Sequence, residues 1–332
     1  MNNVMEGGLK NRNKMNGIGI IKTASYLPNN INTNKEVCQN VPGMTEEWIM
    51  SKLGIKRRYY VSEGETASSM ATIVAKKLLL KDGFPHIDPK EIGLIMIASF
   101  SQDYVFPPMS AKIHQAIGGS KHCEVIDVNG VCTGLITASD IAVDTMRRNQ
   151  KIKYAIVIGV EILSRLTDKT DKFSAPFFSD GASGILLGRT PDGIGHINSF
   201  FCTDSTYYED TRLKKGGLIE HEGHKTWTMA VTNMPYSIKE LLKEENLSID
   251  EIDFFIFHQA NKVLNEYILD KMRIPREKSY INVDEIGNTG AASIGIALDE
   301  AMNKKLIKSG DLLMLVGVGA GFNFGANLWR MP

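Results

Sequence analysis

The sequence predicts an α/β fold made of two copies of one unit, each with a parallel-rich mixed sheet under helices and a buried central helix. Short apolar runs alternate with helical patterns along the chain, which is typical of parallel strands joined by helices. Three motifs of the first half also recur in the same order 155 to 160 residues later, which indicates duplication. They are EIGLIMIAS and EIDFFIFHQ at 91 and 251, IDVNG and INVDE at 126 and 281, and VIGV and LVGV at 157 and 315.

The repeat divides the chain into a first half over 17–190 and a second half over 191–332, with the junction near the glycines of 188–195. Residues 1–16 are polar and lack the apolar centre of a signal peptide. We expect them to form a flexible leader.

The composition argues against several kinds of partner. The formal net charge is zero and 23% of the residues are charged, with both signs interspersed, so neither nucleic acid nor a membrane surface is expected as a partner. No apolar run is long enough to span a bilayer. The four cysteines show no CxxC spacing, so we expect no metal site, no disulfide framework and a reducing, cytoplasmic setting. They are Cys38, Cys123, Cys132 and Cys202.

Local patterns place the elements of the first half. Residues 46–55 and 69–81 have helical patterns, and LIMIAS and YAIVIGVEIL have the apolar character of buried strands. The basic run at 56–58 has no assigned role, since most such runs are solvated surface. Glycines in FFSDGASGILLG at 177–188 indicate close backbone packing.

Cys132 lies where an apolar strand at 125–128 turns, through Asn129-Gly130, into a helix over 131–142 that is apolar on most faces. Such a helix is expected to be buried. Free N–H groups and the positive end of the dipole at a helix start both favour a thiolate. The alternative is that Cys132 is a small core residue.

Three further strand ends carry polar or glycine residues. His258 follows the strand at 254–257, Asn288 follows the strand predicted at 279–283, and a glycine turn at 319–321 follows the strand at 312–318. Because chemistry gathers outside the carboxyl ends of parallel strands, we expect these residues to converge with Cys132.

Each of these residues also has a structural interpretation. His258 could be a hydrogen-bonded core histidine, Asn288 an ordinary turn residue, and the glycine turn a close approach of two backbones. Their joint placement at equivalent strand ends favours the functional interpretation. Four other histidines, at 86, 114, 122 and 196, lie in loop-like or polar contexts without a partner pattern.

From Gly17 to Arg330 the sequence resembles the β-ketoacyl-acyl carrier protein synthase III family of the thiolase superfamily. HQAN at 258–261 and GNTGAAS at 287–293 are similar to the family's His and Asn motifs. The resemblance implies a thiolase-like fold in which Cys132 is acylated, while His258 and Asn288 serve decarboxylation and condensation. It also implies an oxyanion hole made by the N–H groups of Cys132 and Gly321. TEEWIMSKLGIKRR, FFSDGASGILLG and GAGFNFGA resemble further family segments.

The resemblance also implies substrate-binding residues. Trp48 stands where the family stacks the adenine of coenzyme A, and Lys52 and Lys172 stand where many members have arginine. Lysine keeps the charge but lacks the planar fork of arginine. Asn261 is also assigned to substrate binding, and Trp227 resembles an aromatic residue that family members place along the substrate tunnel, although a core role is equally open for it.

Two further positions concern protein partners. By resemblance, Phe106 reaches into the acyl pocket of the partner subunit in a homodimer. Val263 replaces the arginine that docks the carrier protein in many members, although Lys262 is adjacent.

The implied reaction loads an acyl-CoA primer on Cys132 and condenses it with malonyl-acyl carrier protein, which initiates fatty-acid synthesis. Coenzyme A thioester is a substrate and no cofactor is expected. The absence of a histidine after His258 and of a cysteine after Cys202 separates the chain from elongating synthases and degradative thiolases. Alternatives are a synthase or acyltransferase of a specialised metabolite pathway, a papain-type hydrolase, and a scaffold without activity.

Overall fold

The computed structural model describes residues 17–80 and 86–332, so the expected leader over 1–16 lies outside the described residues. Two sheets dominate this part of the chain. The first has the strand order β1-β7-β6-β4-β5 and the second the order β11-β12-β13-β8. The first sheet is built from β1 (Gly17–Tyr26), β4 (Ile92–Ala98), β5 (Glu124–Val128), β6 (Tyr154–Ile162) and β7 (Asp180–Thr190), and the second from β8 (Gly195–Thr203), β11 (Phe254–Phe257), β12 (Leu312–Gly319) and β13 (Asn323–Arg330).

The two sheets show the duplication expected from the repeat. In each, a central strand pairs in parallel with one neighbour and antiparallel with the other: β6 with β4 and β7, and β12 with β11 and β13. Short 3-10 turns, Pro89–Glu91 and Ile249–Glu251, precede the corresponding strands β4 and β11. The chain passes from the first sheet to the second between Thr190 and Gly195. The exact boundaries of the two halves stay a prediction.

The prediction of a strand at 279–283 is wrong. Only one isolated bridge forms there, between Ser279 and Phe255, before α8 (Val283–Ile286) begins. The second sheet therefore lacks a full counterpart of β5.

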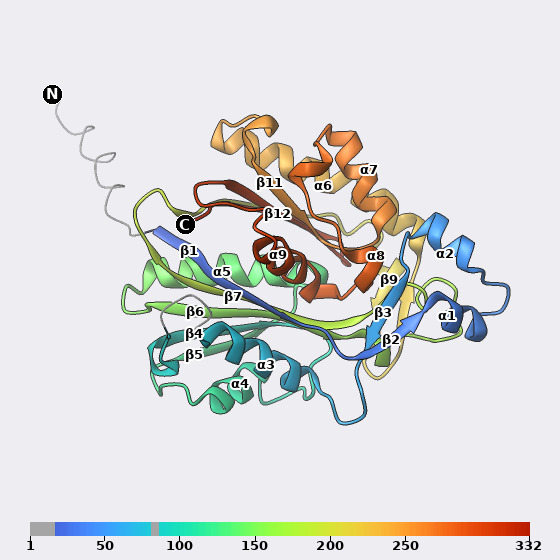
Figure 1. Cartoon of the computed structure of the whole chain (residues 1–332), viewed down its shortest axis with the longest axis horizontal. Coiled ribbons are helices and arrows are strands. Elements are labelled where there is room, and N and C mark those ends of the chain that lie inside the picture. The colour runs from blue at the N-terminus through green and yellow to red at the C-terminus, as the bar shows by residue number, and fades with distance from the viewer. Residues whose placement is uncertain (1–16, 81–85) are drawn as a thin grey trace.

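The elements stack in five layers (Figure 1). The helices α5 (Gly134–Arg148) and α9 (Ser293–Asn303) lie between the two sheets. Outside the first sheet lie α3 (Ala67–Leu79) and α4 (Met109–Ile117), and outside the second lie α6 (Gly223–Glu245) and α7 (Lys262–Met272). The short elements are α1 (Asn34–Asn40), α2 (Glu46–Lys52), β2 (Asn30–Thr33), β3 (Arg57–Tyr60), β9 (Thr211–Leu213) and β10 (Ile219–His221).

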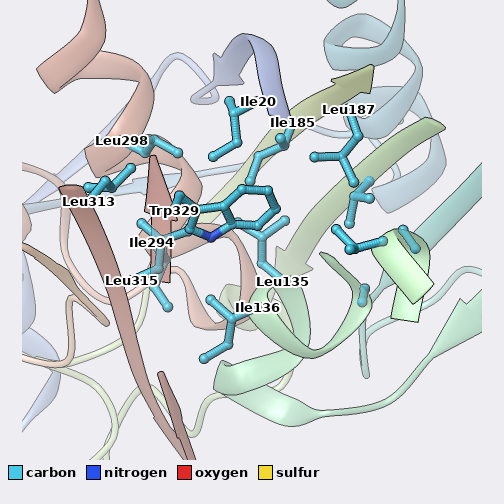
Figure 2. Close-up of a cluster of buried hydrophobic side chains, with 14 of the residues drawn as sticks. Ile20, Leu135, Ile136, Ile185, Leu187, Ile294, Leu298, Leu313, Leu315 and Trp329 are labelled. Atoms are coloured by element: carbon cyan, nitrogen blue, oxygen red, sulfur yellow. The ribbon is translucent and has the colours of Figure 1, made fainter. Parts of the chain in front are cut away.

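The central core explains why α5 is apolar on most faces. Side chains from both sheets and both central helices meet around the fully buried Trp329 of β13 (Figure 2). Leu135 and Ile136 of α5 contribute to the cluster, because the helix is sandwiched between two hydrophobic surfaces. Ile141 departs from the expected pattern, since its side chain is 39% exposed.

The helix boundaries differ slightly from those predicted. The helix expected over 46–55 ends at Lys52, and the one expected over 69–81 covers Ala67–Leu79. Within residues 17–80 and 86–332, no helix has the length and apolar content needed to cross a membrane.

The basic run at 56–58 is only partly a solvated surface. Lys56 and Arg57 form ion pairs with Glu285, whereas Arg58 is fully buried. The guanidinium of Arg58 donates to the Pro176 carbonyl, 2.9 Å from Nε, and to the Asn34 side chain. Burial lowers its pKa to about 10. Arg58 thereby connects β3 to the loop that precedes β7.

Candidate active site

The Cys132 turn joins β5 to α5. The cysteine sits in a 3-10 turn, Val131–Thr133, directly before α5, and so not in the first turn of that helix as predicted. Val131 has a φ of 50°, the left-handed region that β-branched residues rarely adopt. Such local strain is typical of functional turns, and here it presents the residue that follows it.

The thiol of Cys132 is held in its neutral form. Burial and the nearby Glu161 carboxylate raise its pKa to about 12. Loss of hydration and a neighbouring negative charge thus oppose ionisation, in the opposite direction to the effect expected of the helix start. Cys132 has to lose a proton on the way to acylation.

The end of β12 lies against the backbone of Cys132. A Cβ placed on Gly319 would come within 3.2 Å of the Cys132 amide nitrogen, so a larger residue there would crowd the nucleophile turn. Gly321 follows in the next turn, two residues beyond this contact. Its share in an oxyanion hole stays a prediction.

His258 is positioned by β12 and by the start of α9. Its backbone N–H donates to the Val316 carbonyl at 2.7 Å, and its side chain is buried. Nδ1 lies 2.6 Å from the Ser293 Oγ, which also accepts the Gln259 N–H at 3.3 Å. We assign the serine hydroxyl as donor to Nδ1, which leaves the imidazole proton on Nε2. Because burial lowers the pKa of His258 to about 3, the imidazole is neutral and can donate from Nε2.

Asn288 belongs to the second half of the chain, but its backbone is hydrogen-bonded to residues of the first half. Its N–H donates to the Phe177 carbonyl at 3.1 Å, and its own carbonyl accepts the Ser179 N–H at 2.8 Å. The side-chain Oδ1 accepts the Gly290 N–H at 2.8 Å. With Oδ1 engaged, the amide Nδ2 is the group left to donate to a bound molecule.

These segments meet at one place. The Cys132 turn, Val131–Thr133, contacts both β12 and the 3-10 turn Gly290–Ala292, which directly follows Asn288 and Thr289. Ser293, the partner of His258, begins α9 at the end of that turn. The structure thus brings together the segments that carry Cys132, His258 and Asn288, at the ends of β5, β11 and β12.

The expected CoA-binding residues lie around the start of α7. Trp48 of α2 is half-buried and packs in a small cluster with Ala175 of the loop that also carries Lys172. The Lys262 N–H donates to the Leu53 carbonyl at 2.9 Å, which joins the end of α2 to the start of α7. Lys52 is exposed, as is Lys172, whose ammonium lies 4.8 Å from the Phe173 ring centre.

The remaining predicted residues have visible local roles. The Asn261 Oδ1 accepts the Leu264 N–H at 2.8 Å and so caps α7. The rings of Trp227 and Tyr267 lie 5.5 Å apart and connect α6 to α7. Phe106 is 82% exposed, beside the exposed Val105 and Tyr104. The binding roles of these residues stay predictions.

Sequence reasoning missed the residues that support the site. Ser293 stands inside the GNTGAAS motif, but its contact with His258 depends on a fold that joins segments 35 residues apart. Glu161 is a charged residue in an otherwise apolar strand, and that contrast was a usable signal. Among the described side chains, no group of three or more His, Cys, Asp or Glu is arranged to hold a metal ion.

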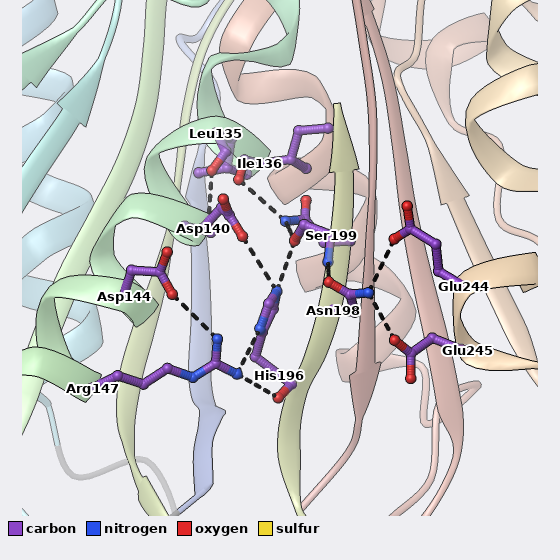
Figure 3. Close-up of polar contacts among 12 residues, drawn as sticks. Leu135, Ile136, Asp140, Asp144, Arg147, His196, Asn198, Ser199, Glu244 and Glu245 are labelled. Carbon is purple, nitrogen blue, oxygen red and sulfur yellow. Dashed lines mark hydrogen bonds and ion pairs between the residues drawn. The ribbon is translucent and has the colours of Figure 1, made fainter. Parts of the chain in front are cut away.

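His196 was also missed, since it lies on β8 with several partners rather than in a loop (Figure 3). Its Nε2 lies 2.7 Å from the Ser199 Oγ and 3.5 Å from Asp140, and its Nδ1 is 3.2 Å from Arg147. This network connects α5 to the second sheet.

The fold and the relatives of this chain are those of a condensing acyltransferase of the thiolase type. The family model described as 3-oxoacyl-[acyl-carrier-protein (ACP)] synthase III matches residues 126–205, and that for its C-terminal part matches residues 242–331. The beta-ketoacyl-[acyl-carrier-protein] synthase III of Lactobacillus helveticus is 34% identical over 96% of this chain and 99% of its own length. The chain therefore belongs to the 3-oxoacyl-[acyl-carrier-protein] synthase III family.

Solved structures agree with this assignment. The 3-oxoacyl-[acyl-carrier-protein] synthase III of Aquifex aeolicus is 33% identical and matches with a TM-score of 0.89, covering 95% of this chain and all of that one. A priming beta-ketosynthase from the R1128 polyketide biosynthetic pathway has a TM-score of 0.88 at 24% identity, covering 96% of this chain and 97% of that one. At that identity the second likeness shows the shared fold alone.

Proposed function

We propose that the protein primes fatty-acid synthesis by loading an acyl group from an acyl-CoA on Cys132 and condensing it with malonyl-acyl carrier protein. The observation that carries the proposal is the contact of the Cys132 turn with the Gly290–Ala292 turn, which lies between Asn288 and Ser293, the partner of His258. The curated relatives named as synthases of this class support the choice of reaction.

In the first half-reaction, the Cys132 Sγ loses its proton and attacks the thioester carbonyl. The carbonyl oxygen becomes an oxyanion, for which the Cys132 N–H and the Gly321 N–H are the proposed donors. Collapse of the intermediate releases coenzyme A, whose sulfur takes up a proton. Preorganised donors of this kind contribute about 3–4 kcal/mol each.

In the second half-reaction, a malonyl thioester loses carbon dioxide and its thioester oxygen becomes an enolate. The neutral His258 donates to this oxygen from Nε2, and Asn288 donates from Nδ2. The enolate carbon then forms a bond to the acyl carbonyl on Cys132, and the freed thiolate recovers a proton. A cationic histidine is not required, because both donors are neutral hydrogen-bonding groups.

Substrate binding is proposed for the residues around α7. Trp48 stacks the adenine of coenzyme A, while Lys52 and Lys172 supply mobile positive charges at the surface. Asn261 and Trp227 line the path of the pantetheine arm. The acyl carrier protein docks beside the start of α7, where the Lys262 ammonium lies 3.3 Å from the Asp284 carboxylate.

A homodimer is proposed on the exposure of Phe106 and its apolar neighbours, since an exposed aromatic group of this kind is typical of an interface. Phe106 would close the acyl pocket of the partner subunit. Light scattering at micromolar concentration tests this, and a fully active monomer would overturn it. A cytoplasmic setting stays a prediction from the cysteine pattern.

The decisive experiment is intact-mass analysis after incubation with a panel of acyl-CoAs, followed by malonyl-acyl carrier protein. The expected result is an acyl adduct on the wild-type protein, none on Cys132→Ala, and a released 3-oxoacyl product. An adduct that persists in Cys132→Ala would overturn the assignment. Transfer of the acyl group to an oxygen or nitrogen acceptor without carbon dioxide release would overturn the condensation.

A further inference from the structure

Glu161 is a buried carboxyl group near the reaction centre that the mechanism above does not use. It lies near the end of β6, opposite Gly181 of β7, and its exposed fraction is 0%. No ion pair joins it to a Lys, Arg or His within the described part of the chain. A carboxyl group buried without a counter-charge costs stability, which makes a role in the site's chemistry worth testing.

The carboxylate fastens the loop that follows β4. It accepts the Phe100 N–H at 3.2 Å and the hydroxyls of Ser99 and Ser101. The Ser101 Oγ in turn accepts the Ile162 N–H at 2.9 Å. The end of β4 is thereby tied to the end of β6 at the level of the reaction centre.

The side chain of Glu161 also supports the turn that carries Asn288. A Cβ placed on Gly290 would lie 2.9 Å from the Glu161 Cγ and 3.6 Å from the Phe100 ring. Gly290 is the residue whose N–H holds the Asn288 Oδ1. Glu161 thus packs against the residue whose N–H holds the Asn288 side chain.

Electrostatically, Glu161 is coupled to the nucleophile. Its charge adds to the burial that raises the pKa of Cys132, and burial raises the pKa of Glu161 itself to about 8. The other segments around it carry no titrating group toward it: Ser99 to Ser101 and Gly290 are uncharged, and Asp180 bonds Ser164 and Val61 instead. The pKa of His258 is lowered by burial alone.

We propose that Glu161 is a positioning residue: its side chain supports the Asn288–Gly290 turn, which packs against the Cys132 turn, and its negative charge, where it is ionised, opposes ionisation of the Cys132 thiol. The inference rests on the proposed function for its meaning in catalysis. Its charge effect is measurable without any substrate.

The first test follows the rate of iodoacetamide alkylation of Cys132 against pH, read by mass spectrometry of its peptide. Glu161→Gln removes the charge and keeps the shape, since the amide oxygen can accept from Phe100 and its NH₂ can donate to the serine hydroxyls. Because the pKa of Glu161 is about 8, the wild-type protein carries this charge only above that pH. The expected result is a profile whose alkaline limb lies about one pH unit lower, or about tenfold faster alkylation at a fixed pH between about 8 and the midpoint. Asp140→Asn, a partly buried carboxylate on α5 within the His196 network, is the matched control and should leave the profile unchanged.

The second test addresses the turn. Glu161→Ala removes the support below Gly290, so decarboxylation of a malonyl thioester should fall at least tenfold while Cys132 is still alkylated. An unchanged alkylation profile in Glu161→Gln, or an equal shift in Asp140→Asn, would overturn the charge role. A wild-type decarboxylation rate in folded Glu161→Ala would overturn the supporting role. Failure of the wild-type protein to accept any acyl-CoA would refute the proposed function instead and leave the alkylation comparison intact.

Discussion

The Nδ1 of His258 lies 2.6 Å from the Oγ of Ser293, although the two residues come from different elements of the second half. Ser293 begins α9 and stands five positions after Asn288 in the same motif. One short segment therefore orients both proposed donors of the second half-reaction. The serine fixes the imidazole tautomer, and the turn fixes the amide.

Replacing Ser293 should harm condensation more than acylation. In Ser293→Ala the imidazole loses the group that keeps its proton on Nε2, so decarboxylation should fall roughly 10- to 100-fold. Self-acylation of Cys132 should change little. Ser139→Ala, a buried serine that bonds only its own helix at the Leu135 carbonyl, serves as the control. Equal losses in both half-reactions of folded Ser293→Ala would contradict the tautomer argument.

Replacing Asn288 should separate the half-reactions further. Asn288→Ala removes a donor to the enolate, so release of labelled carbon dioxide from a malonyl thioester should fall about 10²- to 10³-fold. Intact mass should still show the acyl-enzyme. Asn282→Ala, at a buried asparagine whose backbone N–H bonds Gln259, is a suitable comparison because that bond survives the substitution. Normal condensation by Asn288→Ala would show that the amide is not a donor.

Trp48 should contribute more to CoA-thioester binding than either neighbouring lysine. Its ring is half-buried and held in place by packing, whereas Lys52 and Lys172 are exposed and flexible. An aromatic group fixed in this way loses little entropy on stacking, and an exposed lysine contributes only a screened point charge. Trp48→Ala should raise KM about tenfold, and the two lysine-to-alanine variants about twofold. Similar increases for all three variants would overturn the order.

Acid should destabilise the protein through its buried histidines. Burial lowers the pKa of His196 and His258 to about 3 and that of His221 to about 4. Below pH 6.5, the ordinary pKa of histidine, these side chains bind protons in the unfolded chain but stay neutral in the folded chain. The free energy of unfolding therefore falls as the pH falls toward 4. Each such histidine contributes about 1.4 kcal/mol per pH unit.

Glu161 acts in the opposite direction, because its pKa is raised to about 8 and the folded state then binds the extra proton between about 4.5 and 8. A difference measurement isolates one histidine from such terms. Urea unfolding at pH 7 and pH 5 should show a loss of stability smaller by about 2 kcal/mol, or about 1 kcal/mol per pH unit, in His196→Gln than in the wild type, because the unfolded histidine is only partly protonated near pH 7. Because slopes are compared, a general loss of stability in the variant does not obscure the result. Identical slopes would show that His196 titrates normally in the folded protein.

Much of the architecture was predictable because the sequence itself repeats the same motifs in the same order. The apolar runs at β4, β6, β11 and β12 and the helical pattern of α5 are local signals, and their recurrence indicated two matching sheets. The segment at 279–283 misled because its apolar residues alternate as in a strand, whereas the chain pairs with Phe255 only once. Whether a short apolar run joins a ladder depends on the neighbouring strand, which local sequence does not encode.

The site shows the same division. Residue type and position after an apolar strand indicated Cys132 and His258, whereas Asn288 was indicated by its glycine-flanked motif, since the strand predicted before it does not form. Only the tertiary structure decided their state: the raised pKa of the thiol, the Nε2 proton of His258, and the support of Asn288 by residues of the other half. These properties arise from burial and from contacts between segments far apart in the chain. Burial and through-space contacts, unlike residue type, do not exist until both halves have closed around α5 and α9.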